Sequence, residues 1–220
     1  MVNSIKDKRY WLKLILPVVW YILFIIFADS FERNVRIYAG LVFYLGFAVY
    51  FSALSDWHFS DWGKELKKGK FFWLPVLFTV LGMVAMFGFG SGIAVLFPNA
   101  DSGMSVYSVN NWATLIAFAI TTIILPPIAE EVFYRKAIIA FDSKIIIFIS
   151  AIVSIILFAG AHSLVLLGFI QACLWAIPFS IVYIKTRNVY IGMTAHFICN
   201  FIFNGMTVIF TAIALLNQTV

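Results

Sequence analysis

Residues 112–135 read WATLIAFAITTIILPPIAEEVFYR, and this stretch decides the fold class. Its first 18 residues carry no charge, which is close to the roughly 20 apolar residues that a membrane-spanning helix needs. Two glutamates and an arginine follow directly. Ionisable side chains in or near a spanning helix usually face a cavity or one another. The stretch therefore predicts a membrane helix that carries a polar site.

The composition of the whole chain agrees with this prediction. The 220 residues are 63% hydrophobic and only 11% charged, with a mean hydropathy of +1.00. A soluble domain carries about 25% charged residues, so the composition excludes an ordinary soluble protein. The net charge of +5 reflects basic loops on one side of the membrane, and nucleic acid is not an expected partner.

Seven apolar runs are long enough to span a lipid bilayer. They cover residues 11–28, 37–54, 72–97, 112–141, 145–164, 166–184 and 189–216. Between the second and third runs, residues 55–73 mix tryptophans with lysines, a pattern typical of a segment that lies on the membrane surface. The sequence thus predicts an all-α, polytopic transmembrane bundle of about seven spans plus an interfacial helix or loop.

The distribution of lysine and arginine predicts the orientation of this bundle. With the N-terminus inside, thirteen of the fifteen basic residues fall on inner segments, and only Arg33 and Arg36 fall outside. We therefore expect an integral, multi-pass protein of a bacterial cell membrane with a cytoplasmic N-terminus.

The charged stretch has two interpretations. Glu131 and Arg135 are four residues apart, so one helix face can carry both as an ion pair. Pro126 and Pro127 are expected to break the helical ladder, which places the glutamates near the positive end of a new segment. In the simpler alternative, the span ends at Ala129 and EEVFYRK begins a surface helix.

Two of the three histidines favour the first interpretation. His162 ends FAGAH (158–162) and His196 begins HFICN (196–200), both inside apolar runs. Each motif pairs residues one helical turn apart, so Phe158 shares a face with His162, and His196 with Asn200. Two histidines on separate spans, an asparagine and a glutamate pair on a third span predict one convergent site.

These motifs carry a resemblance to a known family. EEVFYR, FAGAH and HFICN fit the patterns EExxxR, FxxxH and HxxxN in that order. The chain resembles the CPBP family of intramembrane proteases, which includes the type II CAAX prenyl endopeptidases and the Abi-type bacteriocin-processing and immunity proteins. Many members have glycine after the motif arginine, where this chain has Lys136. The resemblance divides the chain into residues 1–111, without a recognisable motif, and a catalytic membrane core at 112–220.

The resemblance implies the site residues and their roles. Glu130 is the implied general base, His162 helps to hold the attacking water, and His196 with Asn200 stabilises the oxyanion. Glu131 and Arg135 are expected to organise the site. The implied function is an intramembrane endopeptidase that hydrolyses a membrane-proximal peptide or protein, in bacteriocin processing or self-immunity or in CAAX-type processing. We also expect its cavity to open towards the cytoplasm.

The residues allow a mechanism with a metal ion and one without. Glu130, His162 and His196 are a zinc-compatible set, and zinc or another divalent metal is an alternative. The HExxH spacing is absent, which favours a reaction that requires no cofactor.

Two further alternatives belong to other classes of protein. A non-catalytic membrane immunity or scaffold protein has the same fold without turnover. A membrane cytochrome uses His162 and His196 as axial haem ligands, but it leaves the EExxxR motif unexplained.

Overall fold

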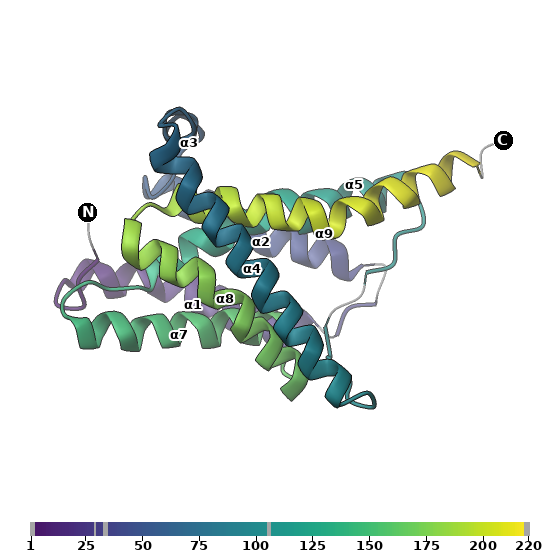
Figure 1. The fold of residues 1–220 in the computed structure, drawn as a ribbon, viewed down its shortest axis with the longest axis horizontal. Coiled ribbons are helices and arrows are strands. Elements are labelled where there is room, and N and C mark those ends of the chain that lie inside the picture. The colour runs from purple at the N-terminus through teal and green to yellow at the C-terminus, as the bar shows by residue number, and fades with distance from the viewer. Residues whose placement is uncertain (1–2, 29, 33–34, 105–106, 218–220) are drawn as a thin grey trace.

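The computed structural model describes residues 3–28, 30–32, 35–104 and 107–217. Arg33, one of the two basic residues expected on the outer side of the membrane, lies outside these described residues. The described part is helical (Figure 1), with α1 (Lys8–Ala28), α2 (Arg36–Ala53), α3 (Phe59–Leu66), α4 (Lys70–Leu96), α5 (Trp112–Ala119), η1 (Ile120–Ile124), α6 (Leu125–Glu130), η2 (Glu131–Ala137), α7 (Lys144–His162), α8 (Leu166–Thr186) and α9 (Val189–Asn217).

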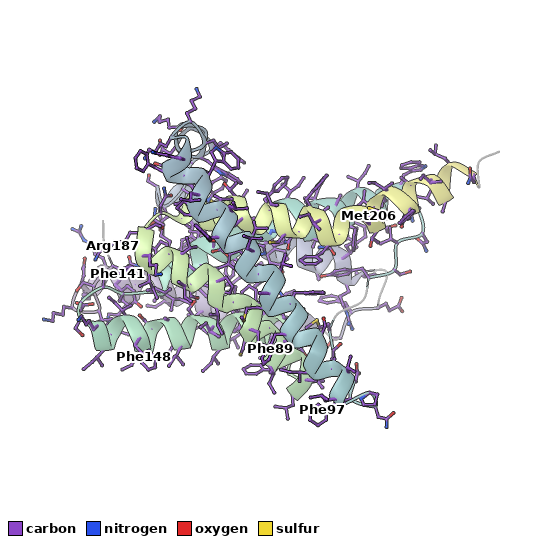
Figure 2. All side chains as sticks on the ribbon, viewed as in Figure 1. Phe89, Phe97, Phe141, Phe148, Arg187 and Met206 are labelled. Carbon is purple, nitrogen blue, oxygen red and sulfur yellow. The ribbon has the colours of Figure 1, made fainter. Side chains whose placement is uncertain are left out.

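Among the described residues, seven stretches are long and apolar enough to cross a membrane. They are α1, α2, α4, the composite Trp112–Ala137, α7, α8 and α9. The predicted bundle of about seven spans is therefore confirmed. The surface of these helices is apolar: Phe148, for example, is 66% exposed and projects away from the bundle (Figure 2). In water this surface is unfavourable, whereas in a lipid bilayer it is the expected one.

The connections between the helices lie at two ends of the bundle, because each spanning helix carries the chain across. The start of α1, α3 and the turns at 138–143 and 187–188 share one end, on the left and upper left of Figure 1. The residues between α4 and α5, and the turn at 163–165, lie at the other end. We call these the N-terminal end and the opposite end.

The segment from Trp112 to Ala137 differs from its prediction. No break occurs at Pro126 and Pro127: the chain stays helical throughout, as α5, η1, α6 and η2, with π-helical turns on both sides of the prolines. A π-helical turn changes the hydrogen-bond register without unwinding the helix, which is how the proline pair is accommodated. Glu130 and Glu131 thus lie inside a continuous helix, and the expected helix N-terminus beside them is absent.

The interfacial segment forms α3 at the N-terminal end and is held to α9. Trp62 Nε1 donates to Thr194 Oγ1 at 2.8 Å, and Asn188 Nδ2 donates to Glu65 Oε2 at 2.6 Å. Lys136, the departure from the family pattern, forms an ion pair of 3.8 Å with Asp56 before α3. These contacts connect segments at the N-terminal end of the bundle to α9 and to the helix that carries the EExxxR motif.

Candidate functional site

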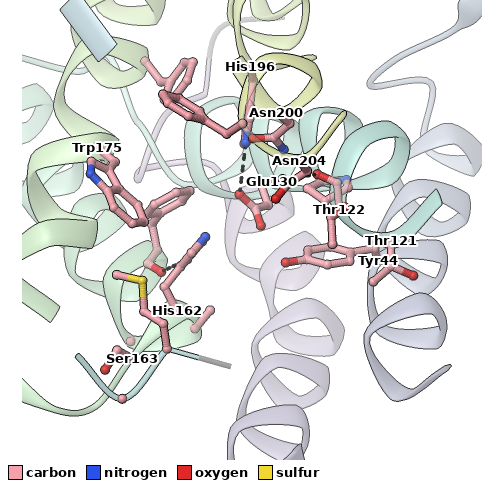
Figure 3. A pocket seen from close by; sticks show the side chains of 18 of the residues that line it. Tyr44, Thr121, Thr122, Glu130, His162, Ser163, Trp175, His196, Asn200 and Asn204 are labelled. Atoms are coloured by element: carbon pink, nitrogen blue, oxygen red, sulfur yellow. Dashed lines mark hydrogen bonds and ion pairs between the residues drawn. The ribbon is translucent and has the colours of Figure 1, made fainter. Parts of the chain in front are cut away.

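A cavity of about 410 Å³ lies in the middle of the bundle (Figure 3). Four of the six predicted site residues line it: Glu130, His162, His196 and Asn200. They come from α6, α7 and α9, three separate spans. The structure thus brings together the polar residues of all three motifs around one space.

Glu130 is almost completely buried and forms part of the cavity wall. Its side chain is 1% exposed, and its Oε2 atom has no hydrogen-bond partner. A buried carboxylate oxygen without a partner is costly. Glu130 therefore presents an unused acceptor to the cavity. The alternative that EEVFYRK begins a surface helix is wrong, because Glu131 and Arg135 are also buried, at 1% and 0% exposure.

Glu131 is not among the residues that line the cavity, and it joins two other site residues. Its Oε1 atom lies 3.4 Å from Arg135 Nη1, which confirms the predicted ion pair, and 3.1 Å from His196 Nδ1. A carboxylate only accepts, so His196 Nδ1 donates this bond. Glu131 consequently fixes the orientation of the His196 ring, a contact that the sequence did not predict.

Arg135 is held among aromatic rings. Its guanidinium carbon lies 4.7 Å from the ring centroid of Phe158 and 5.4 Å from that of Phe179, and Nη2 donates to Ala176 O at 3.2 Å. Phe179 also stacks on His196, with the ring centroids 4.8 Å apart. Cation–π contacts and the Glu131 pair together compensate the buried charge of Arg135. This packing makes Arg135 and Glu131 a rigid support behind His196.

His196 faces Glu130 with its other ring nitrogen. The Nε2 atom lies 3.8 Å from Glu130 Oε2. This separation is longer than a direct hydrogen bond, so the two polar atoms are neighbours at the cavity wall without being bonded to each other.

His162 lies on another wall of the cavity (Figure 3). Its Nδ1 atom is 2.9 Å from Phe158 O and its ring stacks on that of Phe158, with the centroids 4.2 Å apart, so the two residues do share a helix face as predicted. A carbonyl oxygen only accepts, so Nδ1 carries the proton and Nε2 of the neutral ring is left as an acceptor. His162 can therefore accept a hydrogen bond from a molecule in the cavity.

The sequence missed further polar residues of the cavity wall, among them Tyr44 and Asn204. Tyr44 comes from α2, and its hydroxyl is directed towards the Glu130 carboxylate in Figure 3. Nothing in the sequence distinguishes this tyrosine from others in apolar runs. Asn204 was detectable, because it continues the four-residue spacing of His196 and Asn200. Its Nδ2 donates at 3.5 Å to Thr122 O, the carbonyl that Pro126 deprives of an α-helical donor.

The cavity reaches the opposite end of the bundle. Its wall includes Gly103 and Met104, between α4 and α5, and the turn residues Ser163, Leu164 and Val165. Leu164 is 71% exposed. Each of these residues lies at the end that faces away from the N-terminus. A cytoplasmic N-terminus and a cavity that opens towards the cytoplasm are therefore incompatible, although the sequence predicted both.

The proposed zinc ligands do not converge. Among the residues that the structure describes, no three histidine, cysteine, aspartate or glutamate side chains form a group that could hold a metal ion. Glu130 and His196 are neighbours, but none of the described contacts joins His162 to either of them. The arrangement of these side chains does not fit a three-ligand zinc site.

One comparison with known proteins gives a match. Residues 111–202 match the family model described as type II CAAX prenyl endopeptidase Rce1-like. The matched region contains all six predicted site residues, and it confirms the resemblance to the CPBP intramembrane proteases. No curated protein and no solved structure matches the chain.

Proposed function

Because residues 111–202 form a region like the type II CAAX prenyl endopeptidases, a family of peptidases, we propose that this protein hydrolyses peptide bonds inside the membrane by means of a water molecule activated by Glu130. One observation carries the proposal: a buried carboxylate oxygen without a partner, at the wall of a cavity of about 410 Å³, 3.8 Å from a histidine nitrogen. A general base needs such access to the proton that it removes.

The first chemical step uses residues on facing walls of the cavity. A water molecule donates one hydrogen to Glu130 and the other to Nε2 of His162, which directs an oxygen lone pair at the substrate carbonyl carbon. As the water oxygen forms its bond to that carbon, Glu130 takes the proton and the carbonyl oxygen becomes an oxyanion. The Nδ2 amide of Asn200 donates to this oxyanion, together with His196 when its Nε2 carries a proton.

The second step breaks the peptide bond. The tetrahedral intermediate collapses, the carbon–nitrogen bond breaks, and the proton on Glu130 passes to the leaving amine. The products are a carboxylic acid and an amine, and Glu130 regains its starting state. Glu131 and Arg135 touch no reacting atom, so they act as positioning residues for His196.

The variant Glu130→Gln tests the proposal directly. We expect cleavage of membrane-proximal peptides to fall by about 10²–10⁴-fold, which is the usual contribution of a general base. Glu32→Gln makes the same substitution at an exposed glutamate and serves as the matched control. Both variants should give the same yield of folded protein in detergent. Full cleavage by Glu130→Gln contradicts the proposed base.

The same pair of variants separates a peptidase from a non-catalytic protein. An immunity or scaffold protein has no turnover to lose, so Glu130→Gln and the parent protein should then protect a host cell equally. The chain keeps every proposed catalytic residue, four of the six are buried, and His162 and Asn200 are half-buried at the cavity wall, so we favour turnover.

The site geometry also disfavours a cytochrome. Both ring nitrogens of His196 face carboxylates, since Nδ1 lies 3.1 Å from Glu131 and Nε2 lies 3.8 Å from Glu130. Neither nitrogen is therefore free for an axial bond to haem iron in this arrangement. A purified protein without a Soret absorption band supports the peptidase.

A further inference from the structure

We propose that the substrate enters from the extracytoplasmic side of the membrane, and that it is a segment of an exported polypeptide without acidic side chains beside the cleaved bond. This inference rests on the proposed function and names the substrate class of the same site. It reverses the orientation of the cavity that the sequence predicted.

The first support is the position of the cavity along the bundle. It extends from Glu130 in mid-membrane to Gly103, Met104 and the turn at 163–165. No residue of the turns at 138–143 or 187–188 or of α3 is part of its wall, within the described chain. The route from solvent to Glu130 thus begins at the opposite end.

The N-terminal end is closed by packed side chains. Beyond Glu130, the residues Phe133, Tyr134 and Arg135 are each 0% exposed, and Phe51 of α2 packs on Phe133 with the ring centroids 6.2 Å apart. The N-terminal segment covers the same helix, because Asn3 Nδ2 donates to the carbonyls of Lys136 and Ala137. A polypeptide cannot reach Glu130 through this layer without displacing the core.

The opposite end has a defined mouth. Ser163 Oγ donates to Ser102 O at 2.7 Å, which holds the residues after α4 against the turn between α7 and α8. Two glycines make this approach possible: a Cβ at Gly103 would lie 2.4 Å from Val165 Cγ2, and one at Gly168 would lie 1.9 Å from Ser102 O. Gly103 also has a φ of +61°, which favours glycine. The mouth is therefore formed where the residues that follow α4 pack closely against the turn between α7 and α8.

The basic residues identify which side this end faces. Arg9, Lys13, Lys64, Lys67, Lys68 and Lys144 all belong to segments at the N-terminal end. Loops rich in lysine and arginine stay in the cytoplasm. The N-terminal end is then cytoplasmic, and the mouth of the cavity lies on the outer side.

The cavity wall defines the chemistry of the substrate. Among the described residues that line the cavity, Glu130 is the one acidic or basic side chain apart from the two histidines, and amides, hydroxyls and aromatic rings make up much of the remainder. Acidic groups near the cleaved bond would be repelled by Glu130 in this poorly hydrated space. A prenylated cytosolic C-terminus would be on the wrong side of the membrane, so an exported peptide is the better substrate.

Thiol labelling tests the side of the mouth without any need for activity. Leu164→Cys lies at the mouth, and Lys67→Cys, at the exposed surface of the N-terminal end, is its matched control. In intact cells, a membrane-impermeant maleimide should label Leu164→Cys several-fold above the parent protein, whose Cys173 and Cys199 give the background. Lys67→Cys should react only in inside-out vesicles. The reverse pattern overturns the inference.

Cleavage in oriented vesicles tests the substrate side. The probe is a library of fluorogenic decapeptides without acidic residues, added outside sealed right-side-out or inside-out vesicles, with Glu130→Gln as the blank. We expect at least tenfold more cleavage with right-side-out vesicles. Cleavage confined to inside-out vesicles overturns the inference. Absence of cleavage in both preparations, with Leu164→Cys labelled from outside, contradicts the proposed function and leaves the side of the mouth supported.

Discussion

The carboxylate of Glu131 binds His196 and Arg135 at once, with its Oε1 atom 3.1 Å from His196 Nδ1. The first glutamate of the motif faces the cavity, whereas the second supports the histidine from behind. Adjacent residues in one helix thus acquire different roles because the helix directs them to different neighbours. Substitution of Glu130 is therefore expected to affect mainly activity, and substitution of Glu131 to affect stability as well.

The first prediction concerns Glu131→Gln. The substitution removes the negative charge beside Arg135, which is 0% exposed, and leaves that cation without its partner. Loss of one member of a buried ion pair costs about 3–5 kcal/mol. We expect a large decrease in the temperature of unfolding in detergent, together with loss of cleavage. Glu130→Gln should also lose cleavage, but with a much smaller change in unfolding temperature, because the Oε2 atom of Glu130 has no hydrogen-bond partner to lose. Equal unfolding temperatures for the two variants would contradict this division of roles.

The second prediction concerns the glycine that lies against Glu131. A Cβ at Gly192 would lie 2.7 Å from Glu131 Oε2, closer than packed atoms allow. Gly192→Ala should therefore displace the carboxylate from His196 and cost about 1–3 kcal/mol by overpacking. Cleavage should fall mainly through kcat, since the cavity wall itself is unchanged. Gly205→Ala, on the same helix, meets nothing closer than 3.8 Å and should keep full activity and stability.

The sequence was sufficient for the fold class and for the pairs of side chains that share a helix face. The lengths of the apolar runs predicted all seven spans, because a bilayer imposes one helix length on every span. Spacings of four residues predicted which side chains share a helix face, as Glu131 with Arg135 and Phe158 with His162 show. Both inferences need only local geometry. The division of the chain at residue 111 stays a prediction.

Contacts between side chains of different helices could not be predicted from the sequence. The pairing of Glu131 with His196 joins residues 65 positions apart, and Tyr44 reaches the site from a helix without any motif. The proline pair was expected to break the helix, but the chain stays helical because π-helical turns lie on both sides of the prolines. The carbonyl of Thr122, which lacks an α-helical donor, accepts a hydrogen bond from Asn204. The orientation of the cavity also depends on how the helices pack around Glu130, which no single span reveals.

The third prediction concerns metal. Glu130, His162 and His196 do not converge as three ligands, so we expect the reaction to use only side chains and water. Cleavage should then change by less than twofold after treatment with a strong chelator, and the purified protein should contain far less than one zinc ion per chain. Loss of cleavage in the chelator that added zinc restores would contradict this prediction. A parallel measurement on a zinc peptidase confirms that the chelator is effective.

The final prediction concerns the N-terminal segment, which is hydrogen-bonded to the turn that follows the motif helix. The Ser4 hydroxyl and the Ile5 N–H donate to Asp142, and these bonds hold the pKa of Asp142 below its usual value. Since the pKa is lower in the folded protein, the tie is present at neutral pH and is lost only as the pH falls through the lowered pKa. Asp142→Asn removes the charge at neutral pH, so trypsin should cleave at Lys6 and Lys8 several-fold faster than in the parent protein. Asp61→Asn, at a surface pair on α3, is the control and should leave that rate unchanged. Equal cleavage rates in both variants would mean that Asp142 does not hold the segment, and that the bonds from Asn3 to Lys136 and Ala137 suffice.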